Sequence, residues 1–352
     1  MRQRGYAEPI TLHEKGRRRW FTAIVAVAVI AMIALVGSST PWPSALVIRA
    51  VFTKGGEATA AEMDRHVPST PVRAQSNISY GSAGHDTTLD VFSPRSATGP
   101  LPTIVWIHGG AWISGDKRDV DPYLRILAGH GYTTVGLNYT VGPEATYPTA
   151  LIQLNSALSY IDAHAARLGI DPQRIVLAGD SAGAQLASQL VGIITDPDYA
   201  HLIGIRPAMT PSRLKAVILN CGVYDLGALA ELTGIGAWGF KTALWAYSGT
   251  KDWSQSYVGS TMSTIDFVTS AYPPTYISGG NGDALTWLQS VPMARALSTV
   301  GVPTTTLFWS ADHEPRLPHE YQFHLDLPDA RIALDATLDF LSAQLGRTAQ
   351  PG

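Results

Sequence analysis

The sequence is poor in cysteine and in charge. Cys221 is the only cysteine among 352 residues, which excludes an intramolecular disulfide and a cysteine-rich metal site. Charged residues make up 15% of the chain and the formal net charge is −3, so no basic field is available to hold a nucleic acid. Internal repeats and low-complexity tracts are also missing. What is present is 45% hydrophobic residues, enough to bury the core of a large α/β domain.

One long uncharged stretch lies near the N-terminus. Four basic residues between positions 15 and 19 precede an apolar run over 21–37. Because positive charge prefers the cytoplasmic side, this pattern predicts a basic cytoplasmic tail over 1–19 and a transmembrane signal anchor over 20–38. The rest of the chain would then lie outside the cytoplasm, held at the cell membrane. The alternative is a signal peptide that is cleaved near residues 36–38, which would give a secreted protein.

The chain after the apolar run divides into a connector, one domain and a short tail. Residues 39–71 contain a helix-like piece interrupted by Gly55-Gly56 and bounded by prolines. This piece predicts a connector that either lies at a membrane interface or packs on the domain. Residues 72–346 are predicted to form the domain, and residues 347–352 a tail. Within the domain, the aromatic-rich insertion over 225–272 predicts a lid or cap over the sheet.

Apolar runs alternate with helical patterns from Val72 onward. Residues 73–81 and 87–94 alternate in polarity as a pair of antiparallel strands does, and six later runs are continuous, as in strands buried on both faces. These six runs are TIVWIHGG, YTTVGLNY, RIVLAGDS, LKAVILNCG, PPTYISGG and TTTLFWSAD. Helical segments separate most of them. The sequence therefore predicts an α/β fold with a mostly parallel, doubly wound sheet and helices on both of its faces.

A Gly-X-Ser-X-Gly motif joins the third of these runs to a helix. The segment GDSAG, residues 179–183, ends the strand and opens the helical pattern SAGAQLASQLVGII. A sharp strand-to-helix turn leaves no room for side chains at the two glycines, and it exposes the serine hydroxyl beside a helix N-terminus. Ser181 is therefore the predicted catalytic nucleophile. The motif also arises by chance in glycine-rich chains, but a strand before it and a helix after it favour the functional interpretation.

A second glycine turn follows the first apolar run. The segment TIVWIHGGAW ends the strand at His108-Gly109-Gly110, where backbone N–H groups can point towards the nucleophile. The tetrahedral intermediate of acyl transfer carries an oxyanion that such donors stabilise. Gly109, Gly110 and Ala182 are the predicted donors, and His108 is predicted to hold the loop. An ordinary turn is the alternative.

The segments HGGAW, GDSAG, LGIDPQRI and PPTYISGGNGD together resemble the hormone-sensitive-lipase-like branch of the α/β-hydrolase fold, the carboxylesterases. The resemblance extends from about Val72 to Leu345. It implies a serine hydrolase that cleaves esters of short to medium acyl chains through an acyl-enzyme, without a cofactor. Many members have HGGG where this chain has HGGAW, a variant similar to that of kynurenine formamidase and feruloyl-esterase-like relatives. An amidase or formamidase is thus one alternative, and a hydrolase-shaped binding protein without catalysis is another.

The resemblance also implies that serine, acid and histidine follow one another along the chain. Asp283 comes after the PPTYISGG run and before a helix, where the family places its acid, and where a helix N-cap is the competing interpretation. Three histidines follow the last strand. His319 is the predicted base, because HEYQF resembles the family's histidine followed by an aromatic residue. His313, which is nearer the strand end, is the first alternative and His324 the second.

Tryptophans are expected around the small-molecule ester substrate. Trp112, Trp238 and Trp245 are the predicted substrate-binding residues, although the two in the insertion have an equal claim to form a small core of the lid. The segment ADHEPRLPHEYQFHLD lacks the spacing of an HExxH helix, so no metal and no cofactor are predicted. The predicted partners are an ester and a membrane, and no nucleic acid.

Overall fold

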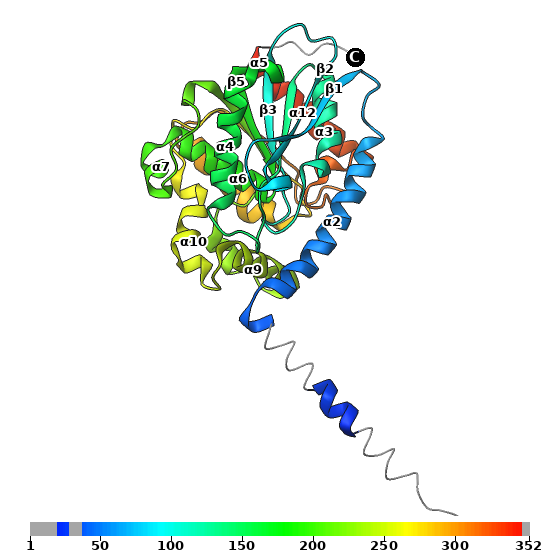
Figure 1. The fold of residues 1–352 in the computed structure, drawn as a ribbon, viewed down its shortest axis with the longest axis vertical. Coiled ribbons are helices and arrows are strands. Elements are labelled where there is room, and N and C mark those ends of the chain that lie inside the picture. The colour runs from blue at the N-terminus through cyan, green and yellow to red at the C-terminus, as the bar shows by residue number, and fades with distance from the viewer. Residues whose placement is uncertain (1–19, 28–36, 347–352) are drawn as a thin grey trace, which may run out of the picture.

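The structure is a computed structural model that describes residues 20–27 and 37–346 (Figure 1). An eight-stranded sheet runs through the domain in the order β1-β2-β4-β3-β5-β6-β7-β8. The first two strands and the β2–β4 pair are antiparallel, and every other neighbouring pair is parallel. The predicted antiparallel pair and mostly parallel sheet are therefore confirmed. The strands are β1 Val72–Ser79, β2 Thr88–Pro94, β3 Leu101–Ile107, β4 Thr133–Leu137, β5 Ile170–Asp180, β6 Leu214–Asn220, β7 Thr275–Gly279 and β8 Thr304–Phe308.

Helices cover both faces of this sheet, as expected for continuous apolar strands whose side chains alternate between two cores. On one face, Val105 and Ile107 of β3 share a core with α4 (Thr149–Ala163), α6 (Ala182–Thr195) and α11 (Val291–Thr299). On the other face, Ile104 and Trp106 share a core with α3 (Asp121–Gly129) and α12 (Pro328–Leu345). Two short helices, α5 (Ala165–Leu168) and α7 (Pro197–Ile203), complete the connections.

The predicted lid insertion folds into helices between β6 and β7. It contains α8 (Leu226–Ala230), α9 (Gly234–Ser248) and α10 (Tyr257–Met262). Figure 1 shows α9 and α10 together at one end of the domain, beyond the sheet. Because parallel strands end at one edge of a sheet, the carboxyl ends of β3 and β5 lie beside each other, with Ile107 paired to Gly179.

The connector over 39–71 forms a long helix, α2 (Trp42–Asp64), that packs on the domain. The two glycines predicted to interrupt it lie inside the helix instead. Gly56 faces the side chain of Asp119, and a β-carbon at this position would come within 3.0 Å of that carboxyl carbon. The glycine therefore permits a close helix contact. In Figure 1 α2 lies along one side of the domain and begins beside α9.

Among the described residues, no helix combines the length and apolar character needed to cross a membrane. The predicted span over 20–38 falls partly on residues 28–36, which lie outside the described residues. The predicted tails over 1–19 and 347–352 also lie outside them.

Candidate active site

Ser181 occupies a strained turn between β5 and α6. Its φ and ψ are 50° and −119°, and its backbone N–H donates to the carbonyl of Asn220, at 2.8 Å. A β-carbon on Gly183 would lie 2.0 Å from the carbonyl oxygen of Ile107, and one on Gly179 would lie 2.5 Å from the backbone of Gly183. The two glycines are thus required by close backbone approach, and the turn holds the serine hydroxyl at the sheet edge.

A chain of hydrogen bonds joins the serine to a histidine and an aspartate. His319 Nε2 lies 2.9 Å from Ser181 Oγ, and His319 Nδ1 lies 2.6 Å from Asp283 Oδ2. Asp283 follows β7 and is 7% exposed. Its second oxygen accepts the N–H of Leu285 at 2.9 Å, so the carboxylate also caps the following helical turn. The geometry of Asp283 is therefore compatible with both the N-cap interpretation and the catalytic interpretation.

The two alternative histidines have other partners. His313 Nε2 lies 3.0 Å from Asp329 Oδ1, and its ring packs on Trp309. His324 Nδ1 lies 3.0 Å from a carboxylate oxygen of Glu62 on α2. Of the three predicted candidates, the structure brings only His319 to Ser181.

The loop after β3 is fixed by the acidic residue that precedes the serine. The N–H of Gly109 donates to Asp180 Oδ2 at 2.7 Å, and the indole N–H of Trp106 donates to Oδ1 at 2.7 Å. The prediction of Gly109 as an oxyanion donor is therefore corrected, because its N–H is already occupied. Within the described part of the chain, the N–H groups of Gly110, Ala111 and Ala182 donate to no acceptor. Ala111 has a positive φ of 51°, which the sequence did not signal.

His108 is buried behind this loop, as predicted for a structural residue. Its Nδ1 lies 2.8 Å from the carbonyl of Gly109, and its ring stacks on Tyr139 with centroids 4.5 Å apart. Burial lowers the pKa of the imidazole, which keeps the ring neutral. A neutral ring can hold the loop without placing a charge next to the oxyanion donors.

Glu320 adds a carboxylate to the site that the sequence analysis did not single out. It follows the histidine in the chain, has a φ of 58°, and places Oε1 3.7 Å from His319 Nε2. It also contacts Asp180, whose pKa is raised well above its usual range by burial and by the charge of Glu320.

The imidazole of His319 is stabilised in its charged form. Desolvation lowers its pKa, but the hydrogen bond that the ring donates to Asp283 and the charges of Glu320, Asp283 and Asp180 raise it to about 9. Only the neutral ring can accept the serine proton. The acidic limb of kcat/KM is therefore expected near pH 9, with activity rising as the pH increases through that value.

Removing the charge of Glu320 tests whether that charge helps to raise the pKa of His319. We expect Glu320→Gln to move the acidic limb of kcat/KM to lower pH, because a neutral neighbour stabilises the imidazolium less. Hydrolysis at neutral pH should then be faster than in the wild-type protein. Glu231→Gln removes an exposed carboxylate outside the pocket and serves as the control. An unchanged pH profile of Glu320→Gln, measured on a short p-nitrophenyl ester, would contradict the assignment.

Cys221, Asp283 and His319 offer ligand atoms within 4.8 Å of one another. Burial raises the pKa of the Cys221 thiol well above its usual range, which disfavours the thiolate that binds a metal. The histidine and aspartate are hydrogen-bonded to each other, and a metal would replace that bond. The geometry therefore fits a proton relay better than a metal centre.

A pocket of about 370 Å³ opens over Ser181 and His319. Its apolar wall comes from Val51 and Phe52 of α2, Phe240 of α9, and Phe323. From its sequence, α2 is expected to be a connector, and none of its residues is predicted to lie in the site. Only the tertiary packing of α2 against η2 (Lys117–Asp119) and α9 brings them there.

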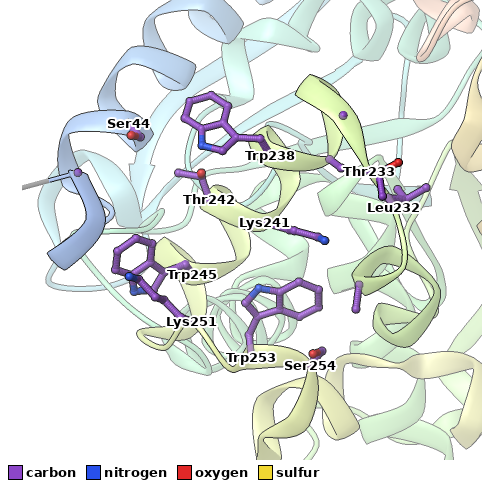
Figure 2. Close-up of a pocket in the computed structure, with 14 residues that line it drawn as sticks. Ser44, Leu232, Thr233, Trp238, Lys241, Thr242, Trp245, Lys251, Trp253 and Ser254 are labelled. Carbon is purple, nitrogen blue, oxygen red and sulfur yellow. The ribbon is translucent and has the colours of Figure 1, made fainter. Parts of the chain in front are cut away.

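The predicted substrate-binding tryptophans lie elsewhere. Trp112 is fully buried; its Nε1 donates to Gln185 Oε1 at 3.1 Å and its ring stacks on Tyr247. The positive φ of 59° at Trp112 turns the indole into the core instead of the pocket. Trp238 and Trp245 line a separate hollow of about 570 Å³ that does not include Ser181 (Figure 2). None of the three tryptophans therefore lines the pocket over Ser181, whose apolar wall comes from α2, Phe240 and Phe323 instead.

Comparisons with known proteins agree with this fold. The probable carboxylic ester hydrolase LipM of Mycobacterium tuberculosis is 30% identical over 60% of this chain and 49% of its own length. Esterase LipQ of the same organism is 28% identical over 80% of this chain and 66% of its own. The chain thus spans about half to two thirds of these relatives. The crystal structure of esterase B from Lactobacillus rhamnosis superposes with a TM-score of 0.72 at 25% identity, covering 86% of this chain and 96% of that one.

The BD-FAE family profile matches residues 89–297, which include β2 to α11, Ser181 and Asp283. This match covers more than half of the chain. With its α/β-hydrolase fold and carboxylesterase relatives, the chain belongs to the BD-FAE family.

Proposed function

We propose that this protein is a serine carboxylester hydrolase. The observation that carries the proposal is the continuous hydrogen-bonded chain from Ser181 Oγ through His319 to Asp283. A serine hydroxyl becomes nucleophilic when a histidine accepts its proton and a carboxylate orients that histidine. The names of the curated relatives and the esterase fold support an ester as the substrate.

In the proposed reaction, Ser181 Oγ attacks the ester carbonyl while His319 Nε2 accepts the hydroxyl proton. The oxyanion of the tetrahedral intermediate lies between the N–H groups of Gly110, Ala111 and Ala182. Collapse of the intermediate expels the alcohol, which takes the proton from His319, and leaves an acyl-serine. Water then attacks the acyl group, with His319 as base, and regenerates the serine. Asp283 orients the ring and stabilises the imidazolium throughout.

The pocket supports acyl groups of short to medium length. Its volume of about 370 Å³ lies at the small end of ligand sites, and its apolar wall suits an alkyl chain. An amide substrate would use the same residues but needs protonation of a poorer leaving group. Rates on matched p-nitrophenyl esters and p-nitroanilides separate the two activities, and we expect the esters to be faster.

A fluorophosphonate probe tests the nucleophile directly. We expect covalent labelling of the wild-type chain at Ser181, mapped by mass spectrometry of its peptides, and none of folded Ser181→Ala. Absence of labelling on the folded wild-type chain would favour a hydrolase-shaped binding protein instead.

We further propose that the domain works outside the cytoplasm, anchored by residues 20–38. The apolar run and its preceding basic residues support this orientation. The protein is then expected to stay in the membrane fraction after carbonate washing, while external protease reaches residues from Val72 onward. A secreted product that begins near Ser39 would show that the segment is a cleaved signal peptide.

A further inference from the structure

The surface formed by α2 and α9 carries an unusual share of exposed apolar side chains. Seven of the thirteen large apolar residues exposed between residues 37 and 346 lie on these two helices. They are Trp42, Leu46, Val47, Val51 and Phe52 on α2, and Ile235 and Trp238 on α9. Ile235 is 85% exposed, Val51 66% and Val47 64%. A cluster of this kind marks an interaction surface more often than an ordinary solvated one.

Charged side chains are almost missing from this face. Residues 234–240 of α9 contain none, and the first twelve residues of α2 contain only Arg49. The guanidinium of Arg49 turns to the domain, where it pairs with Glu144 and donates to the carbonyls of Ile113 and Gly142. The solvent side of α2 over its first three turns is thus uncharged. A helix face that contacts only water normally carries charged or polar side chains.

Basic and aromatic groups border the apolar face at the hollow of about 570 Å³. Figure 2 shows Lys241 and Trp245 of α9 around it, with Lys251 and Trp253 from the following segment. The ammonium of Lys251 lies 4.5 Å from the centre of the Trp245 ring. Indoles beside lysines are typical of side chains that sit at the level of lipid headgroups.

The point at which the N-terminal apolar run meets the domain indicates what covers this face. The uncharged run over 21–37 ends at Gly37, which itself lines the hollow, and Lys251 binds the carbonyl of Ser38. At Gly37 and Ser38 the described chain therefore enters the domain beside the apolar face. A bilayer that receives the apolar run lies next to α2 and α9.

We propose that the α2–α9 face lies on the lipid bilayer and that the active site takes esters carried in that bilayer. This inference rests on the proposed esterase function and deepens it. Val51 and Phe52 belong to the exposed face and also line the pocket over Ser181, and Phe240 of α9 lines the pocket beside them. An acyl chain leaving the bilayer would thus reach the nucleophile along a continuous apolar path.

Fluorescent labelling of the full-length chain in vesicles tests the contact. Cys221 is fully buried, so a maleimide dye reports only on an introduced cysteine. With the environment-sensitive dye NBD and vesicles of phosphatidylcholine and phosphatidylglycerol, we expect Val47→Cys and Ile235→Cys to give blue-shifted emission that brominated lipid quenches. Thr98→Cys, in the exposed loop between β2 and β3 at the opposite end of the parallel strands, is the control and should report water. Water-like emission at all three positions overturns the proposal. A blue shift that depends on protein concentration, and that brominated lipid does not quench, also overturns it and would indicate contact with another copy of the chain.

Activity on two forms of ester separates this proposal from the proposed function. The double variant Val47→Asp with Ile235→Asp should hydrolyse a soluble p-nitrophenyl ester in detergent as the wild type does. It should hydrolyse a diacylglycerol carried in the same vesicles about tenfold more slowly, since two charges now oppose the bilayer. Ile152→Asp with Ile332→Asp removes apolar side chains that are also exposed, at 51% and 48%, on α4 and α12, and it should change neither rate. Equal rates of wild type and double variant on both esters overturn the bilayer contact, whereas a wild-type chain inactive on the soluble ester overturns the esterase function itself.

Discussion

Ser181→Ala should lower kcat by about 10³ to 10⁶, because the members of a catalytic triad act as one unit and the nucleophile alone accounts for most of their effect. The hydroxyl that the substitution removes is hydrogen-bonded to His319 Nε2 at 2.9 Å. Alanine keeps the β-carbon, so the strained turn with a φ of 50° is no harder to form than with serine. The turn is held by the backbone bond to Asn220, which the substitution does not touch.

The expected loss therefore falls on chemistry and not on folding. The melting temperature of Ser181→Ala should stay close to the wild-type value, and a short-chain ester or its product should still bind. Both quantities can be measured on the same preparation as kcat. A folded Ser181→Ala that keeps most of the wild-type rate would remove the basis of the proposed mechanism.

The parts of the fold that depend on local pattern could be predicted from the sequence. Continuous apolar strands alternate with amphipathic helices, and their order fixes a parallel sheet with two cores. The GDSAG turn could also be placed, because it needs a glycine for a reason within the turn itself: a β-carbon on Gly179 would lie 2.5 Å from the backbone of Gly183. These features need information from only a few neighbouring residues.

Features that depend on packing between distant segments could not be predicted. The N–H of Gly109 is bound by Asp180, 71 residues later, so its removal from the oxyanion donors is visible only in three dimensions. Phe52 lines the pocket because α2 folds back onto the domain, and no pattern within α2 reports that contact. Lys117 is similarly 0% exposed and pairs with the buried Asp90 at 3.2 Å, although a lysine after a glycine turn is normally solvated.

Alanine substitution of each of the three histidines that follow β8 should distinguish the catalytic base from two structural residues. His319→Ala is expected to lower kcat/KM by at least about 10² to 10⁴, the usual contribution of general acid–base catalysis. Its ring is the one within hydrogen-bond distance of Ser181 Oγ, and Asp283 holds the opposite nitrogen at 2.6 Å. Imidazole added to the buffer should restore part of the activity, since the vacated space opens onto the pocket and a diffusible base can enter it.

His313→Ala and His324→Ala should keep kcat/KM within a few-fold of the wild-type value while lowering stability. His313 pairs with Asp329, which is 7% exposed, and its loss leaves that carboxylate without its partner. His324 pairs with Glu62 and ties the loop before α12 to α2, with both side chains partly exposed, so its loss should cost about 1 kcal/mol or less. Neither variant should respond to imidazole. Rates on one short-chain ester and thermal melts of the same variants measure both effects. If His313→Ala were inactive while His319→Ala stayed close to the wild type, His313 would be the base, and the hydrogen-bonded chain would no longer support the mechanism.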